Sequence, residues 1–181
     1  MCSEITLLEE LHGWWEEYDY VCNFNEGFAL VKLNGKWNII NQEGKLLSNQ
    51  WFDDIEDFHE WFAPVKLNGK WNIINKEGKL LSNQWFDAAD YFHEGFAMVY
   101  LNDKYNFINQ EGKLLSNQWF DNVRPFYEGF APVELNRKWN FVNTEGNLLS
   151  DQRFDYVWNF YGGFALVELN NKWNFINTQG K

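Results

Sequence analysis

The chain has 181 residues, of which 45% are hydrophobic and 20% aromatic, and its formal net charge is −11. This length is enough to bury a core, and the aromatic share favours β-structure because aromatic residues are enriched in strands. The 26 acidic against 15 basic residues argue against binding to nucleic acid or to anionic membranes, since both depend on Lys and Arg.

The first residues carry the clearest helix signal. Ser3 can cap a helix over residues 3–12, and Gly13 can end it. Ile5, Leu8 and Leu11 would share one face. We therefore expect residues 1–17 to form a capping helix and lead-in that covers the open end of a repeat array. The alternative is a helix that binds a partner.

The same region bears on the cellular compartment. It has no basic start followed by an apolar run, so it does not read as a signal peptide, and no window of ~18 apolar residues predicts a membrane span. Cys2 and Cys22 lie outside the repeated positions, which favours free thiols over a disulfide framework. The expected location is cytoplasmic.

From Tyr18 onward the sequence repeats every 34 residues. Phe28 recurs as Phe62, Phe96, Phe130 and Phe164, and Trp37 recurs as Trp71, Tyr105, Trp139 and Trp173. A fixed period of this size marks a repeat architecture. We divide the repeat domain, residues 18–181, into repeats 1 to 5 at 18–51, 52–85, 86–119, 120–153 and the incomplete 154–181.

Each repeat predicts a small antiparallel meander. A strand over residues 28–33 leads into Asn34-Gly35, a strong signal for a type I′ hairpin turn, and residues 36–41 return. A connection over 42–44 with a left-handed glycine then leads to a third strand beginning at 45–48. That glycine recurs as Gly44, Gly78, Gly112, Gly146 and Gly180.

The first turn changes along the chain. Its fourth copy reads Asn136-Arg137. Arg tolerates positive φ poorly, at about 1 kcal/mol, so we expect this turn to be strained or of another type.

A two-residue hairpin also fixes which side chains share a face. Val31 is expected opposite Asn38, and Ala29 opposite Ile40. Both faces of the hairpin are then largely apolar, so neighbouring repeats must cover them. The predicted fold is all-β: antiparallel hairpin repeats stacked as an open solenoid-like array. The alternative is a closed, propeller-like ring.

The repeated pattern Glu-Gly-Phe-Ala-x-Val-x-Leu-Asn-Gly-Lys-Trp-Asn-x-Ile-Asn-x-Glu-Gly-Lys resembles the WG repeat, also called the KWG repeat, over residues 18–181. The family pattern has a Gly-Lys-Trp-Gly core. Lys-Trp recurs at 36–37, 70–71, 138–139 and 172–173, with Lys104-Tyr105 as a softened copy. The Gly after Trp is replaced throughout, by Asn38, Asn72, Asn106, Asn140 and Asn174. The resemblance implies a β-rich binding or scaffolding module, mostly bacterial, with no catalytic residues to carry over.

One repeated stretch offers a candidate binding surface. Ser48-Asn49-Gln50-Trp51-Phe52-Asp53 returns in repeats 2 and 3, and in the fourth copy Arg153 replaces the Trp. A position that accepts both Trp and Arg is expected to be partly exposed. The candidate ligand-binding residues are therefore Trp51, Trp85 and Trp119, as a ladder, with Gln50, Gln84 and Gln118. Aromatic faces and amides can hold a sugar or a peptide. The alternative is that the indoles pack between repeats.

Catalytic signals are weak. Gly-x-Ser-x-Gly, a Walker loop and a dinucleotide fingerprint do not occur, and three histidines are too few to predict a metal site. The repeated aspartates, such as Asp53, are expected to cap turns or accept backbone N–H groups.

The function expected from the sequence is therefore a non-catalytic module for protein–protein interaction or scaffolding, without a cofactor. The first alternative is a carbohydrate or cell-wall binder that uses the Trp ladder. The second is a hydrolytic enzyme, which no motif supports.

Overall fold

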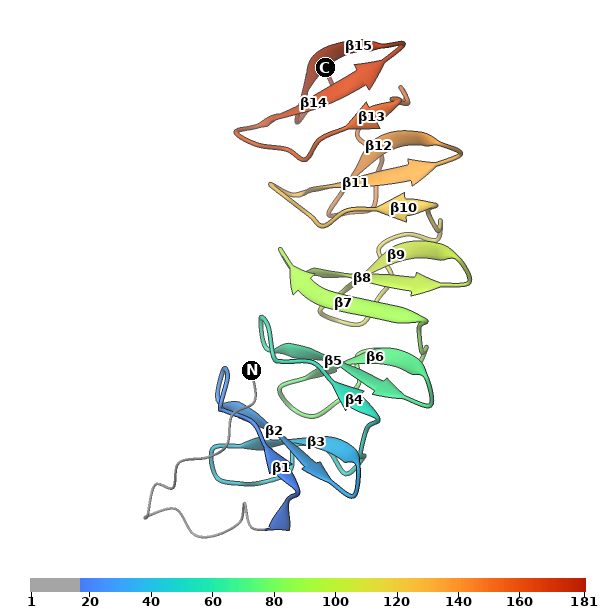
Figure 1. Cartoon of the computed structure of the whole chain (residues 1–181). Helices are drawn as coiled ribbons and strands as arrows, with labels where there is room; N and C mark the ends of the chain where they lie inside the picture. The colour runs from blue at the N-terminus through green and yellow to red at the C-terminus, as the bar shows by residue number, and fades with distance from the viewer. Residues whose placement is uncertain (1–16) are drawn as a thin grey trace. The chain divides into compact units, whose positions relative to one another are not determined.

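A computed structural model describes residues 17–181, and every regular element in that part of the chain is a β-strand. Fifteen strands form five separate antiparallel sheets of three strands each, one per repeat (Figure 1). The sheets follow one another in tandem along the chain, and none of them closes into a barrel. The all-β prediction of tandem hairpin repeats is confirmed, while the expected helix over residues 3–12 lies outside the described residues.

The chain divides into two compact units, Met1–Asp87 and Ala88–Lys181. The first unit holds two sheets: β1 (Tyr20–Val21), β2 (Phe28–Leu33) and β3 (Lys36–Asn41), then β4 (Asp54–Ile55), β5 (Phe62–Leu67) and β6 (Lys70–Asn75). The second unit holds three: β7 (Ala88–His93), β8 (Phe96–Leu101) and β9 (Lys104–Asn109); β10 (Asn122–Val123), β11 (Phe130–Leu135) and β12 (Lys138–Asn143); β13 (Tyr156–Val157), β14 (Phe164–Leu169) and β15 (Lys172–Asn177).

The central hairpin of each repeat has the register expected from its two-residue turn. Val31 pairs with Asn38, and Ala29 with Ile40. In the turn, Asn34 and Gly35 have φ values of 51° and 78°, as a type I′ turn requires. The same geometry persists where the sequence is less suited to it, because Arg137 has a φ of 62°. The expected strain at this turn is therefore present.

The third strand of the sheet is not the one we expected. It comes at the start of the repeat, where Tyr20 and Val21 pair with Lys32 and Val31. The stretch expected to become a strand after Gly44 forms only isolated bridges, from Leu46 to Ile40 and from Phe52 to Trp37. This stretch still runs along the outer edge of β3, because Leu47 N–H donates to Ile39 O at 2.8 Å and Phe52 N–H donates to Trp37 O at 2.8 Å.

A second tight turn, which the sequence did not reveal, precedes each central hairpin. In repeat 4 it is Glu128-Gly129, with φ values of 51° and 80°. Glu is unfavourable in this conformation, at about 1 kcal/mol. Its carboxylate makes an offsetting contact, because Oε1 and Oε2 accept the N–H groups of Gly162 and Gly163 in the next repeat at 2.7 and 2.8 Å. Glu94 holds the turn of repeat 4 in the same way.

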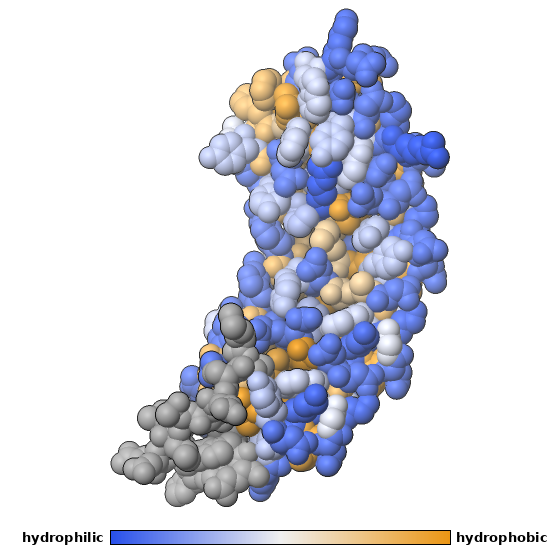
Figure 2. All heavy atoms as spheres, in the orientation of Figure 1, coloured by the Kyte–Doolittle hydropathy of each residue, from blue (hydrophilic) through white to orange (hydrophobic). Residues whose placement is uncertain are grey.

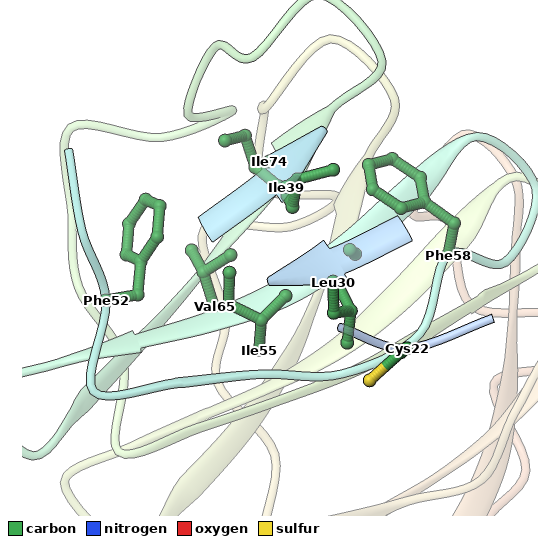
Figure 3. Close-up of a cluster of buried hydrophobic side chains, with 9 residues drawn as sticks. Cys22, Leu30, Ile39, Phe52, Ile55, Phe58, Val65 and Ile74 are labelled. Carbon is green, nitrogen blue, oxygen red and sulfur yellow. The ribbon is translucent and has the colours of Figure 1, made fainter. Parts of the chain in front are cut away.

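Within each compact unit, the core lies between successive sheets. In the first compact unit one buried cluster joins Leu30 and Ile39 of the first sheet to Val65 and Ile74 of the second (Figure 3). In the second unit, Phe141 of β12 meets Phe160 of the next repeat edge to face, with centroids 4.9 Å apart. Within each unit, adjacent sheets therefore cover one another's apolar side chains.

Cys22 lies in the first of these clusters and is disulfide-bonded. The expectation of free thiols is therefore wrong for this residue. The cytoplasmic location stays a prediction.

Candidate interaction surface

The three indoles of the predicted ladder are each half-buried. Trp51 packs against the cluster formed by Val21, Ala29, Val31 and Ile40, and its ring centroid lies 6.4 Å from that of Tyr18. Trp85 packs against the cluster between the first two sheets. These two side chains therefore support the core, and a role in ligand binding stays a prediction.

The glutamines beside these indoles are exposed, and their backbones have defined roles. Gln84 and Gln118 donate their N–H groups to the hydroxyls of Ser82 and Ser116, at 3.0 and 3.1 Å. Gln50 does the same with Ser48, at 3.1 Å. These contacts shape the turn before each Trp and leave the amide side chains at the surface.

The Asn that replaces the family's Gly after Trp is a structural residue. Asn38, Asn72, Asn106 and Asn140 are all fully buried. In repeat 3, Asn106 Nδ2 donates to Ser116 O at 2.8 Å and Gln118 O at 3.3 Å, and its Oδ1 accepts from Phe107 N–H at 2.8 Å. The side chain thus ties the stretch that follows each hairpin to the edge of the sheet, and this satisfies its buried polar atoms.

The other repeated positions are structural as well. Phe28 stacks on Phe58 of the next repeat with centroids 4.6 Å apart, and Trp37 lies beneath Lys32 Nζ at 5.0 Å. A Cβ added to Gly78 would come within 1.9 Å of Leu47 O, and one added to Gly146 within 2.5 Å of Leu115 O. The same strand position is held by Trp71, Tyr105, Trp139 and Trp173, and Gly44 and Gly112 have the same positive φ, 74° and 78°.

The repeated Asp joins adjacent repeats, and its predicted role in accepting backbone N–H groups is confirmed. Asp121 Oδ2 accepts Asn136 N–H at 2.6 Å, while Oδ1 forms an ion pair with Lys104 of the preceding repeat. The bond from Lys104 and then that from Asn136 N–H lower the pKa of this carboxyl below its ordinary value. The pKa of Asp53 and that of Asp155 are lowered for the same reasons, by Lys36 and Lys138 first.

A surface hollow that sequence reasoning missed lies in the second compact unit. It has a volume of about 500 Å³, and its lining residues are Arg124, Tyr127, Tyr156, Trp158, Asn159, Phe160 and Tyr161. Tyr161 is 90% exposed and Trp158 is 55% exposed. These are large aromatic side chains, and a folded chain gains little by leaving them in water.

Arg124 organises this hollow. Its guanidinium lies over the ring of Trp139 at 4.4 Å and over that of Tyr156 at 4.8 Å. Its Nη1 donates to Val157 O of the next repeat at 2.7 Å. Tyr156 in turn meets Trp158 edge to face, with centroids 5.8 Å apart. The cation therefore holds an aromatic wall in place across the junction of repeats 4 and 5.

A signal for this site exists in the differences between repeats. Residues 156, 158 and 161 are Tyr, Trp and Tyr, whereas the same positions in repeat 2 are Asp54, Glu56 and His59. When the five repeats are aligned, all three positions are aromatic together only in repeat 5. A search for sites among the positions that stay constant between repeats therefore misses these three variable positions.

Within residues 17–181, no group of three or more His, Cys, Asp or Glu side chains is placed to hold a metal ion. The described part of the chain also contains no helix long and apolar enough to cross a membrane.

Solved structures with limited backbone similarity include Kluyveromyces lactis Hsv2, at 13% identity and a TM-score of 0.45, over 86% of this chain and 58% of that one. A eukaryotic initiation factor matches at 13% identity and a TM-score of 0.48, over 89% of this chain and 52% of its own. The chain thus spans little more than half the length of these structures. No curated protein matches the sequence.

A family model described as the WG containing repeat matches five tandem segments, residues 17–37, 39–71, 73–105, 107–139 and 141–173. These segments span most of the chain, with the same spacing as the sheets. The chain belongs to the WG repeat family.

Proposed function

We propose that this chain is a non-catalytic protein-interaction module and that the aromatic hollow around Arg124 is a contact surface. The observation that carries the proposal is the exposure of Trp158 and Tyr161 beside an ordered guanidinium. Trp, Tyr and Arg are the residues that most often dominate the energy of protein–protein interfaces. These residues lie at variable positions of a repeat array, and such arrays present different side chains on the same repeated backbone.

The order of the hollow supports the same conclusion. The guanidinium of Arg124 is held by two aromatic rings and a backbone carbonyl oxygen in the unbound protein. The side chain is therefore already ordered before a partner binds. Preorganised side chains lose less entropy on binding. The chain's net charge of −11 favours partners with basic surfaces around an apolar anchor.

The test is affinity capture with the full chain and with the double variant Trp158→Ala/Tyr161→Ala. Proteins that bind through the hollow should be retained by the parent chain and lost, with affinity reduced at least about tenfold, from the variant. Phe24→Ala is the matched control, because Phe24 is an exposed aromatic residue in the other compact unit. Equal capture by the parent chain and the double variant would contradict the proposal.

The carbohydrate alternative has its own test. A glycan array probed with the parent chain and with Trp85→Ala should show a signal that the substitution removes, if the predicted ladder binds sugars. Trp85→Ala also removes packing from the first cluster. Thermal unfolding of the variant must therefore show that it remains folded at the assay temperature.

A further inference from the structure

Trp61 occupies a turn position that glycine holds in the other four repeats. It is the second residue of the tight turn before the central hairpin, and the equivalent residues are Gly27, Gly95, Gly129 and Gly163. Its φ is 69°, in the left-handed region that glycine adopts readily and a bulky side chain does not. Strained residues of this kind persist where the surrounding structure holds them, and they gather at binding sites.

The backbone around Trp61 is held firmly. His59 and Phe62 close the turn with N–H···O bonds of 2.8 and 3.1 Å, and Trp61 N–H donates to Glu26 Oε2 of the preceding repeat at 2.9 Å. Packing does not explain why the strain is accepted, because the Trp61 side chain is 53% exposed. A Cβ added to any of the four equivalent glycines also has no atom within 4 Å, so the position faces open space.

The ring of Trp61 already attracts one cation. Phe62 pairs with Asn75 across the hairpin, so Trp61 and Lys76 are the next residues along the two strands. Lys76 Nζ lies over the indole, 5.5 Å from its centroid, and has no carboxylate partner among the described residues. This lysine is also specific to repeat 2, because the same position holds Gln42, Gln110, Thr144 and Thr178 in the other repeats.

The charge of the chain favours a basic ligand at this ring. The stretch that leads to the turn carries exposed carboxylates at Asp54, Glu56 and Asp57, and the whole chain has 26 acidic against 15 basic residues. Figure 2 shows a mostly hydrophilic surface on the visible face, with hydrophobic residues in separate patches. An acidic surface steers basic partners toward it, and Trp is the best aromatic acceptor of a cation, most often of Arg.

We propose that Trp61 binds an arginine side chain from a basic segment of a partner protein, and that Lys76 occupies this place in the unbound chain. An arginine can displace Lys76, because a guanidinium is planar and more weakly hydrated than an ammonium group. The proposal rests on the proposed function in that the ligand is a protein. It uses a different surface, so loss of arginine binding at Trp61 and loss of capture at the hollow are scored on different variants.

The experiment is a titration of the fluorescently labelled peptide Gly-Arg-Gly-Arg-Gly with the full chain in about 0.15 M salt, followed by anisotropy. Saturable binding is expected, with a Kd below about 1 mM, and the uncharged peptide Gly-Gln-Gly-Gln-Gly should not bind. Trp61→Gly should weaken binding at least about threefold, as loss of one cation–π contact implies. This variant leaves the net charge unchanged and gives repeat 2 the glycine of the other repeats, and thermal unfolding checks that it is folded.

Lys76→Gln should strengthen binding about twofold or more, because it removes the competing cation, and it should have no such effect in the Trp61→Gly background. Lys45→Gln is the matched control, since it removes the same charge from another exposed lysine of the first compact unit. Equal strengthening by Lys76→Gln and Lys45→Gln would assign the effect to net charge and overturn the proposal. Equal binding by the parent chain and Trp61→Gly would overturn it as well.

Nuclear magnetic resonance gives a local readout of the same titration. The indole N–H signal of Trp61 is the one missing from the spectrum of Trp61→Gly, and it should shift as the peptide is added to the parent chain. Peptide-induced shifts confined to other signals would place the peptide on another surface and contradict the proposal. Protein capture through the hollow around Arg124 would be unaffected by that result.

Discussion

Strands β12 and β15 have almost the same sequence, Lys-Trp-Asn-Phe-Val-Asn and Lys-Trp-Asn-Phe-Ile-Asn, yet their environments are opposite. The Trp, Asn and Phe of β12 are buried, while those of β15 are exposed. Both hairpins have the same register and the same turn geometry. The comparison shows that the local sequence determines the hairpin, whereas contacts from outside the hairpin, such as that of Phe160 with Phe141, bury the residues of β12.

The largest difference in unfolding free energy is expected between variants of Phe141 in β12 and Phe175 in β15. Phe141→Ala should lower the free energy of unfolding by about 3–5 kcal/mol, since it leaves a cavity next to Phe160. Phe175→Ala should change it by less than about 0.5 kcal/mol, as is usual for an exposed residue. Urea unfolding followed by circular dichroism measures both. A similar loss in the two variants would mean that β15 is covered in solution.

The Asn pair should follow with a smaller effect. Asn140→Ala removes the partners of Ser150 O, Gln152 O and Phe141 N–H in a buried place, which should cost about 2–3 kcal/mol. Asn174→Ala removes one exposed bond and should be close to neutral. Unfolding midpoints of the two variants in urea provide the test. A neutral Asn140→Ala would show that water replaces the side chain.

On the side of the sheet that faces the preceding repeat, β12 and β15 should have similar environments. A Cβ at Gly146 or at Gly180 would come within 2.5 Å of a leucine carbonyl oxygen of the repeat before it. Gly146→Ala should therefore destabilise by about 2 kcal/mol, the sum of a positive-φ cost and a contact that must shift. Gly129→Ala is the control, because nothing lies within 4 Å of its added Cβ, and about 1 kcal/mol is expected. Thermal unfolding of the two variants should rank them in that order.

The smallest difference concerns the ion pairs. The pKa of Asp155 is lowered, chiefly by Lys138, so its contribution to stability is present above the unfolded pKa of about 3.9 and is lost as pH falls through the lower folded value. Lys138→Met should remove part of that acid dependence. Lys172→Met should not, because Lys172 has no carboxylate partner among the described residues. Unfolding midpoints between pH 7 and pH 2 would show identical slopes if the pair contributes nothing.

The hairpins could be predicted from the sequence because their signals are local. Asn34-Gly35 predicts a two-residue turn, and a turn of that length fixes the register of the two strands that it joins. The stretch that follows the hairpin, residues 46–53, could not be predicted in this way. Its backbone follows the edge of β3 only through isolated bridges, so its sequence has no alternating pattern. The burial of Asn38 could not be predicted either, because its partner is a carbonyl oxygen ten residues away.

The hollow escaped prediction for a related reason. Arg124, Tyr156 and Trp158 come from two repeats, and a period of 34 residues does not state which copies touch. The Glu-Gly turn was also missed, since Glu128 is a poor residue for positive φ and only its contact with Gly162 and Gly163 explains it.

That glutamate has a consequence for how such a chain can change its length. The carboxylates of Glu94 and Glu128 reach amides 34 and 35 positions ahead, and four lysines each reach an aspartate 17 positions ahead. Excision of residues 120–153 would bring Glu94 to Gly162 and Lys104 to Asp155, so that the carboxylate of Glu94 and the ammonium of Lys104 again have partners. Duplication or loss of one whole 34-residue period therefore leaves these donors and acceptors paired where the remaining repeats meet. This is a chemical reason for proteins built in this way to differ by whole numbers of repeats.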